Sequence, residues 1–312
     1  MNGCYMTDSD VKITIGITAY NEGDYLCEAW SSVIQQTDNR WNAVMILDGG
    51  ADKETQRIYN NIEHPFLKKI KLDNNKGPYF ARNLAIENAK DDWYCHLDAD
   101  DRLPPNMVYN IQSTIDKYPN SKYIIGRCLY FDENSFHVRV HSGFLDDRLA
   151  FNLPFNGQSP IKRELYYELG GFCKEFYNGG ADWDFWLGVC ELNSIGINID
   201  SVIYERRFRK NNVGSNWIHK RYQFAELLIN RHIEYFQGDK KNICLSKSYE
   251  FAAREYRRIG VRNEAAILAK QALKLGNDNQ ILKTIIYEYE MPFWRYRLRR
   301  LGRIASKFNR IF

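Results

Sequence analysis

Short apolar runs alternate with segments of helical periodicity over the first 120 residues, and this alternation constrains the fold more than any other feature. Residues 11–17 alternate as a half-buried strand does, and apolar residues within 26–34 recur at helical spacing. Further apolar runs at 43–47, 69–72 and 93–97 are each followed by a segment typical of a helix. Repeated strand–helix units predict an α/β fold with a mostly parallel sheet and helices on both faces.

The alternation weakens after residue 120. Strands are still expected at 123–130 and 197–204, and helices at 163–169 and 182–192. From about Ser215 onward the pattern is helical, and part of it resembles one helix pair of the tetratricopeptide type, which cannot bury its own face alone. The sequence therefore predicts an α/β domain over residues 1–214 and a helical region over residues 215–312.

The charge of the chain is unevenly distributed. Residues 291–312 contain seven basic residues and no acid, and without these seven the net charge of +4 becomes −3. A weakly acidic body argues against a nucleic-acid partner, which would require a basic patch across the fold. Aromatic and aliphatic residues interleave with the basic ones in this tail. We expect it to form an interfacial helix on an anionic membrane, with a helix packed on the domain as the alternative.

Several absences point to a cytoplasmic protein. The seven cysteines form no CxxC pair, which is typical of reduced thiols. Residues 1–10 contain no apolar signal core, and no run approaches the roughly 18 apolar residues that a membrane span requires. We expect the protein in the cytoplasm, in peripheral contact with the inner face of the cell membrane through its tail.

Three carboxylates, those of Asp98, Asp100 and Asp101, follow the apolar run that ends at Leu97. At the carboxyl end of a parallel strand they would lie in the crevice where open α/β sheets bind ligands. Carboxylates placed so closely repel one another, and a cation that prefers oxygen ligands relieves this repulsion. The sequence predicts a Mn²⁺ or Mg²⁺ site that takes its other ligands from substrate phosphates. The alternative is a solvated acidic turn before Pro104.

Two other residues, Asp48 at a strand end and Arg82 in a helix, are candidates for substrate binding on weaker evidence. Asp48 follows the second apolar run, where a carboxylate can accept hydrogen bonds from ribose hydroxyls or base N–H groups. Taken alone, an Asp before Gly49 is more typical of a turn. Arg82 lies in the helix that Pro78 opens, where a guanidinium near the helix N-terminus suits a phosphate. A solvated basic face is the alternative for Arg82.

Asp182 and Asp184 begin an aromatic helix after two glycines. Asp at a helix start is often only a cap. The functional interpretation is a general base placed against an acceptor hydroxyl, with Trp183 and Trp186 as platforms for sugar rings. The residues alone do not decide which of the two carboxylates would be the base.

Five ordered motifs resemble those of family 2 glycosyltransferases with the GT-A fold. They are ITIGITAYNE at 13–22, LDGGAD at 47–52, NKGPYFARNLA at 75–85, LDADD at 97–101, and LGGF followed by GGADWDFW within 169–186. The resemblance covers about residues 11–210 and makes residues 1–214 the catalytic domain that binds a nucleotide sugar. It implies an inverting transferase that moves a sugar from a nucleoside-diphosphate sugar to an acceptor hydroxyl.

The resemblance also implies roles for the matched residues. Asp182 aligns with the catalytic base of the family, and Asp184 would support it. Asp98 and Asp100 would surround the metal and the diphosphate, with Asp100 as the direct ligand, and Arg82 would lie beside base or phosphate. The other substrate contacts would come from Thr18, Ala19, Tyr20, Glu22, Asp48, Ala99 and Trp183.

The implied partners are the nucleotide-sugar donor and a glycan or lipid-linked acceptor, and the implied process is synthesis of a surface glycan or polysaccharide. The chain departs from many relatives at Gly49 and Ala181, where they carry an acid. Two other functions compete. A nucleotidyltransferase would need a basic loop after the first strand, but residues 18–23 contain no Lys or Arg. A non-catalytic scaffold would use the helical region.

Overall fold

The computed structural model describes residues 11–132, 135–139, 147–177, 179–208, 221–293, 295–297 and 299. The chain forms two compact units, Met1–Asn212 and Val213–Phe312. The boundary expected after residue 214 lies outside the described residues, as does most of the basic tail, residues 300–312.

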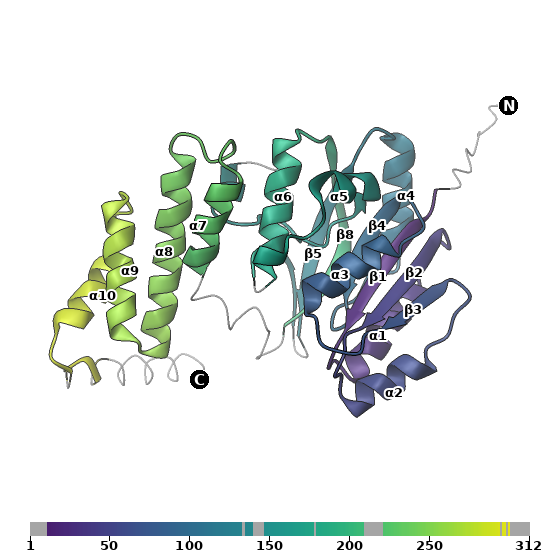
Figure 1. Ribbon diagram of the computed structural model, residues 1–312, viewed down its shortest axis with the longest axis horizontal. Coiled ribbons are helices and arrows are strands. Elements are labelled where there is room, and N and C mark those ends of the chain that lie inside the picture. Colours follow the sequence, from purple (N-terminus) through teal and green to yellow (C-terminus); the bar gives the residue numbers. More distant parts are fainter. Residues whose placement is uncertain are drawn as a thin grey trace. The chain divides into compact units, whose positions relative to one another are not determined.

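An eight-stranded sheet forms the framework of the N-terminal unit in the part of the chain that the structure describes (Figure 1). Its strands are β1 (Ile13–Ala19), β2 (Trp41–Leu47), β3 (Leu67–Lys71), β4 (Trp93–Asp98), β5 (Tyr123–Phe131), β6 (Phe136–Arg139), β7 (Ile161–Lys162) and β8 (Gly196–Arg207). The order is β3-β2-β1-β4-β7-β5-β6, and β8 pairs with β5. The pairs among β1 to β4 and the β5–β8 pair are parallel, whereas β6 and β7 pair antiparallel. The mostly parallel sheet expected from the sequence is confirmed.

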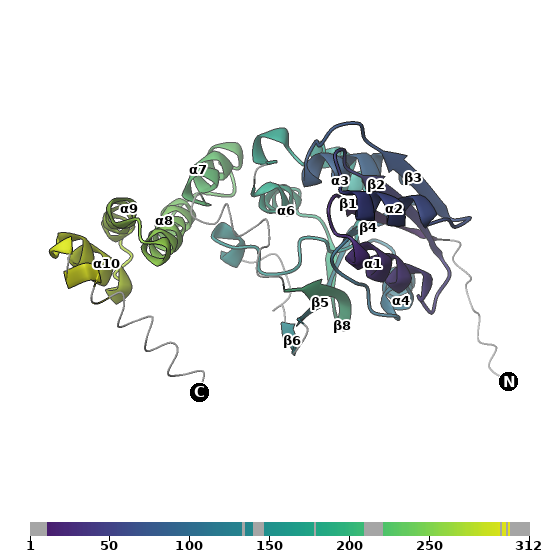
Figure 2. The ribbon, with the colours of Figure 1, turned by 90° about the horizontal axis from the view of Figure 1, so that it is seen from below.

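Helices cover both faces of this sheet. They are α1 (Asp24–Ile34), α2 (Lys53–Asn61), α3 (Pro78–Glu87), α4 (Met107–Lys117), α5 (Arg163–Leu169) and α6 (Ala181–Glu191), with 3₁₀ turns at Asp147–Ala150 and Lys174–Phe176. Apolar residues of α1, α2 and α4 form one core with the inward-facing residues of β1, β2 and β4. Figure 2 shows α1 and α4 on one side of the strands and α3 on the other.

Local sequence explains where several helices begin and end. Asp52 caps α2, because its side chain accepts a hydrogen bond of 2.7 Å from the backbone N–H of Thr55. Pro78 opens α3, where its missing N–H costs no helical hydrogen bond. Gly170 ends α5 in the left-handed conformation, with φ 75°. The short strands β6 and β7 were not expected, because strands of four and two residues are too brief to show periodicity.

The carboxyl ends of β1, β2 and β4 meet at one edge of the sheet. Thr18 pairs in register with Asp98, and Ala19 pairs with Leu47. The backbone N–H of Asp48 donates to the carbonyl of Ala19 at 2.8 Å, immediately beyond the paired residues. The polar loops that follow these three strands therefore lie side by side, as expected for a ligand-binding crevice in a parallel sheet.

The C-terminal unit consists of helices in its described part, as expected. They are α7 (Arg221–Arg231), α8 (Lys240–Ile259), α9 (Arg262–Lys274) and α10 (Gln280–Glu290). Their shared core contains Ala252, Ala253, Ala265, Ala269 and Ala272. Alanines on facing helices allow a close approach of α8 and α9. No described helix is long and apolar enough to cross a membrane, and the described cysteines are free thiols.

Candidate active site

Asp98 lies at the centre of a polar cluster at the carboxyl edge of the sheet. Its Oδ1 accepts hydrogen bonds from Nη2 of Arg82 at 2.7 Å and from Nε2 of His96 at 3.0 Å. Its Oδ2 accepts one from Nε2 of Gln158 at 2.9 Å. All three partners are buried. Donors from three segments of the chain thus hold the carboxylate at the end of β4.

The protonation states in this cluster follow from its contacts. Burial alone would raise the pKa of Asp98, but the charge of Arg82 and the hydrogen bond from His96 outweigh it and hold this pKa well below its usual value. Burial, together with the charge of Arg82, lowers the pKa of His96. At neutral pH Asp98 is therefore ionised and His96 is neutral. Nε2 of His96 then carries the proton that Asp98 accepts.

Gly16 makes room for the residue that supports His96. A Cβ atom at position 16 would lie 2.0 Å from the hydroxyl oxygen of Tyr94. That hydroxyl lies 3.1 Å from Nδ1 of His96, so it can donate to the ring nitrogen that carries no proton. A glycine in the middle of β1 therefore allows Tyr94 to cross the neighbouring strand and complete a chain from Tyr94 through His96 to Asp98.

Arg82 connects Asp98 to Asp182. Its Nη1 lies 3.1 Å from Oδ1 of Asp182, and its side chain is 9 % exposed. Its guanidinium lies over the ring of Tyr79, 4.9 Å from the ring centroid. Burial alone would lower the pKa of Arg82, but the charges of both carboxylates raise it well above its usual value. The carboxylate oxygens that one guanidinium joins can be no more than about 8 Å apart.

The structure separates the two candidate bases on α6. Asp182 is the second residue of this helix, and its side chain is 25 % exposed. Asp184 lies in the same first turn but is buried. The helix N-terminus stabilises a negative charge at both positions. Only Asp182 both contacts Arg82 and remains open to solvent, as a group that receives a proton from an acceptor must.

Asp101, in the loop that follows β4, is hydrogen-bonded to the end of β8. Its Oδ1 accepts a hydrogen bond from the backbone N–H of Arg207 at 2.7 Å, and its Oδ2 accepts one from the hydroxyl of Tyr204 at 2.9 Å. Nε of Arg207 donates to the carbonyl of Asp100 at 3.0 Å. Burial and the charges of Asp98 and Asp100 raise the pKa of Asp101 to about 7. Asp101 is thus an anchor and not a third carboxylate for a cation.

Asp98 and Asp100 remain as the carboxylates that could hold a cation. Among the described residues, no group of three or more His, Cys, Asp or Glu side chains could hold a metal ion. Mg²⁺ is usually bound through only one or two carboxylates and takes water and phosphate oxygens for its other positions. The donor set therefore fits a cation that is held jointly with a diphosphate, and it does not fit a cation held by the protein alone.

Asp48 organises the loop that leads into α3. Its Oδ1 accepts a hydrogen bond from the backbone N–H of Lys76 at 2.8 Å, and its Oδ2 accepts one from Gly77 at 2.9 Å. The structure also accounts for Gly49, because a Cβ atom there would lie 2.3 Å from the backbone nitrogen of Asn74. An acid at position 49 would require this loop to move.

The loop after β1 borders the Asp98 cluster. Oγ1 of Thr18 lies 3.3 Å from Nε2 of His96. Ala19 is buried at the strand end, and Tyr20 is 37 % exposed at the rim. The carboxylate of Glu22 accepts a hydrogen bond of 2.5 Å from the backbone N–H of Tyr20. These residues lie together at the site, whereas their contacts with a nucleoside stay a prediction.

Trp183 and Trp186 do not offer free ring faces. Both rings are buried. Nε1 of Trp183 donates to the carbonyl of Leu149 at 2.7 Å, and Nε1 of Trp186 donates to the carbonyl of Gly157 at 3.1 Å. The geometry therefore favours packing over the sugar-stacking role that we expected. Ala99 is also buried, so its backbone is the part that could face a substrate.

Sequence reasoning missed the segment Asn156 to Gln158. Gln158 contacts Asp98, as described above, and Gly157 packs against Asp182. A Cβ atom at position 157 would lie 3.1 Å from Cβ, Cγ and Oδ2 of Asp182. The segment lies in an irregular stretch without periodicity. In the sequence, the run of polar residues Asn-Gly-Gln-Ser between apolar residues is the feature that could have indicated a functional segment.

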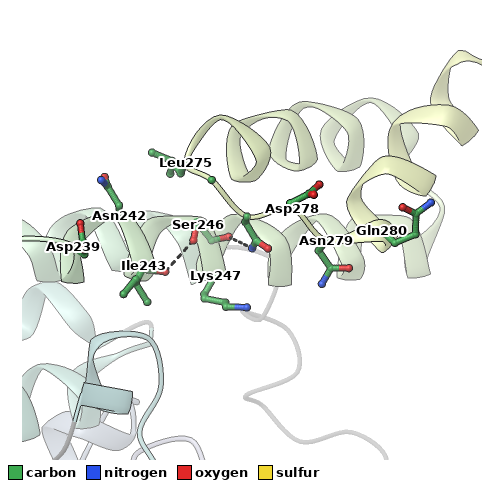
Figure 3. Close-up of a pocket in the computed structure, with 11 residues that line it drawn as sticks. Asp239, Asn242, Ile243, Ser246, Lys247, Leu275, Asp278, Asn279 and Gln280 are labelled. Carbon is green, nitrogen blue, oxygen red and sulfur yellow. Dashed lines mark hydrogen bonds between the residues drawn. The ribbon is translucent and has the colours of Figure 1, made fainter.

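A cavity of about 670 Å³ lies elsewhere, in the C-terminal unit (Figure 3). It is lined by the start of α8 and by the connection between α9 and α10. Asn277 and Asn279, from that connection, donate to the carboxylate of Glu250. None of the residues predicted for catalysis, donor binding or metal binding lines this cavity.

Comparison with known proteins identifies the family. Residues 14–177 match the family described as glycosyl transferase family 2. The match covers more than half of the chain, which therefore belongs to this family and is a glycosyltransferase. An uncharacterized glycosyltransferase of Haemophilus influenzae is 22 % identical over 91 % of this chain and 87 % of its own length. A teichoic acid poly(glycerol phosphate) polymerase of Staphylococcus epidermidis is 31 % identical, over 36 % of this chain and 16 % of its own length.

Solved structures confirm the GT-A fold. TarS 1–349 of S. aureus, in complex with UDP-GlcNAc, matches with a TM-score of 0.64 and 14 % identity over 89 % of this chain and 84 % of that chain. The mannosyltransferase PcManGT of Pyrobaculum calidifontis, in complex with GDP-Man and Mn²⁺, matches with a TM-score of 0.54 and 18 % identity over 89 % and 84 %. The chain spans 50 % of a longer TarS chain. Family membership decides against the nucleotidyltransferase and the scaffold.

Proposed function

We propose that this glycosyltransferase is metal-assisted and inverting, and moves a hexose from a nucleoside-diphosphate sugar to an acceptor hydroxyl. The observation that carries the proposal is the Arg82 bridge. It holds a carboxylate at the metal and phosphate position, Asp98, within about 8 Å of a solvent-open carboxylate, Asp182. Inversion requires the base and the departing diphosphate on opposite faces of the reacting carbon, and this proposal assigns Asp182 to the face of the base and Asp98 to the face of the diphosphate.

Asp182 is the general base of this proposal. Its carboxylate takes the proton of the acceptor hydroxyl as that oxygen forms a bond to the anomeric carbon. The bond from this carbon to the diphosphate oxygen breaks, and its electron pair leaves with the diphosphate. Arg82 aims Asp182 through the contact at 3.1 Å. Asp184 supports the first turn of α6 from its buried position.

Asp100 and Asp98 are the proposed carboxylates for Mn²⁺ or Mg²⁺. When bound, the cation neutralises negative charge on the diphosphate as a Lewis acid. His96 and Gln158 orient Asp98, and Arg207 holds the backbone of Asp100. Mn²⁺ and GDP-Man in the PcManGT structure support both the metal and the class of donor.

The nucleoside pocket of this proposal lies at the rim formed after β1 and β2. It comprises Thr18, Ala19, Tyr20, Glu22 and Asp48, with the backbone of Ala99 beside it. The likeness to the teichoic acid polymerase supports a role in surface-glycan or polysaccharide synthesis, with a glycan or lipid-linked acceptor.

A peripheral membrane contact through residues 291–312 completes the proposal and would place the protein at the cytoplasmic face of the membrane. At the described start of this tail, Phe293 is 60 % exposed, and the guanidinium of Arg297 lies 5.2 Å from its ring centroid. Exposed aromatic and basic groups together favour an anionic interface. A chain ending at Met291 should lose binding to phosphatidylserine vesicles, whereas the full chain should bind them and ignore neutral vesicles. Equal binding by both chains contradicts this contact.

A donor screen followed by one substitution tests the catalytic proposal. Metal-dependent hydrolysis of a panel of nucleotide sugars identifies the donor. Asp182→Asn should then abolish transfer and leave donor affinity largely unchanged, because the amide cannot accept the proton. Asp200→Asn is the matched control, since that side chain is 84 % exposed on β8. Near wild-type turnover of Asp182→Asn would show that the base is another group.

A further inference from the structure

The segment Asn156 to Gln158 has a place in the site that its sequence did not suggest. It contacts both carboxylates of the proposed reaction, Asp98 through Gln158 and Asp182 through Gly157. In the proposed function the sugar that is transferred lies between the departing diphosphate and the base. A segment that touches both carboxylates therefore borders the position of that sugar.

The backbone of this segment is firmly held. The carbonyl of Gly157 accepts the hydrogen bond from Nε1 of Trp186, and the carbonyl of Asn156 accepts one from Oγ of Ser159 at 2.7 Å. Phe155 packs edge-on against Trp186, with 4.8 Å between the ring centroids. A rigid backbone of this kind fixes the positions of the two carboxamide side chains, as a recognition surface requires.

Three carboxamide atoms of the segment have no hydrogen-bond partner within the described part of the chain. They are Oδ1 and Nδ2 of Asn156 and Oε1 of Gln158, and both residues are buried. Proteins rarely leave buried polar side-chain atoms unpaired, because each costs about 1–3 kcal/mol. Nε of Arg82 is also buried and unpaired, and Arg82 and Gln158 both contact Asp98.

We propose that Asn156 and Gln158 recognise hydroxyl groups of the transferred sugar. A carboxamide presents a donor and an acceptor side by side, and a sugar hydroxyl both donates and accepts. Asn156 directly precedes Gly157, which packs on Asp182, and this proposal assigns its unpaired carboxamide to the base side of the site. Gln158 uses its N–H on Asp98, and its free oxygen is an acceptor beside the diphosphate side. This inference rests on the proposed function.

Asn156→Leu is the decisive variant. Leucine has nearly the same size and removes the unpaired polar atoms, so the thermal midpoint of the free protein should stay the same or rise. Affinity for the nucleotide sugar found in the donor screen should fall about 10-fold to 100-fold. Affinity for the matching nucleoside diphosphate, which lacks the sugar, should be unchanged. Asn152→Leu is the control, because Asn152 lies exposed in the same irregular stretch.

Calorimetric titration with Mn²⁺ plus either UDP or GDP, and then the corresponding nucleotide sugars, separates the outcomes. Equal weakening of the diphosphate and the nucleotide sugar overturns the recognition role, and so does no weakening of either. A large loss of thermal stability in Asn156→Leu also overturns it, since it would mean that bound water already satisfies the carboxamide. A wild-type protein that binds none of the nucleotide sugars in the donor panel, and none of the corresponding nucleoside diphosphates, refutes the proposed function itself.

Discussion

Replacement of Arg82 by methionine probes the contact on which the candidate site depends. Methionine keeps much of the side-chain volume but leaves Asp98 and Asp182 without their shared cation. Removing one partner of a buried ion pair costs about 3–5 kcal/mol. The side chains of Asp98 and Asp182 are 21 % and 25 % exposed, so water screens part of this loss. We expect about 3 kcal/mol, which corresponds to a fall of about 6–12 °C in the thermal midpoint of a unit of this size.

The loss of stability in Arg82→Met should become smaller as the pH falls. The folded-state pKa of Asp98 is depressed, so its contribution to stability is present above the ordinary carboxyl pKa and is lost as pH falls through the folded value. In Arg82→Met the lowering charge is gone, and the pKa of Asp98 should rise. Protonation then relieves the unpaired carboxylate. The difference in stability between wild type and variant should be largest at pH 7 and smaller near pH 4.5.

Denaturant unfolding followed by tryptophan fluorescence measures this difference, because five of the seven tryptophans precede residue 213. Arg57→Met is the matched control, since Arg57 forms an exposed ion pair with Glu54 on α2. It should leave unfolding unchanged at both pH values. If Arg82→Met loses the same stability at pH 7 and pH 4.5, or none at all, the electrostatic account of this site is wrong.

Three further changes test the packing around the site and in the C-terminal unit. Gly16→Ala should destabilise the protein by about 2 kcal/mol or more, because its Cβ would overlap the hydroxyl of Tyr94; an unchanged melting curve contradicts this. Asp52→Ala should cost about 1 kcal/mol by removing the cap of α2, and a neutral result in denaturant unfolding would show that the cap is dispensable. Arg257→Met removes the two hydrogen bonds that the guanidinium donates to the buried carboxylate of Glu288, and should lower the free energy of unfolding by about 3 kcal/mol. Hydrogen exchange should become faster only in α8–α10. Faster hydrogen exchange in the N-terminal unit as well would contradict this prediction.

The periodicity of apolar residues and the residues at turns predict much of the fold from the sequence alone. The helix at Arg163–Leu169 was expected at these residues, and its end at Gly170 follows from the left-handed conformation of that glycine. Convergence of the loops after β1, β2 and β4 was also expected, since parallel neighbours end at the same edge of a sheet. Such features depend on residues a few positions apart, and a linear pattern records them.

By itself, the sequence determined the order of strands and helices over the first 120 residues, the acidic residues at the end of β4, and the family. Only the tertiary structure decided that Arg82 joins Asp98 to Asp182, that Asp101 serves as an anchor, and that Asn156 to Gln158 borders the site. It also showed that the ring of Trp183 is buried and that its Nε1 donates to the carbonyl of Leu149. These contacts form between segments up to about 100 residues apart, as in the pair of Arg82 and Asp182. No local periodicity reports such a pairing, because chain folding and not neighbouring sequence brings the side chains together.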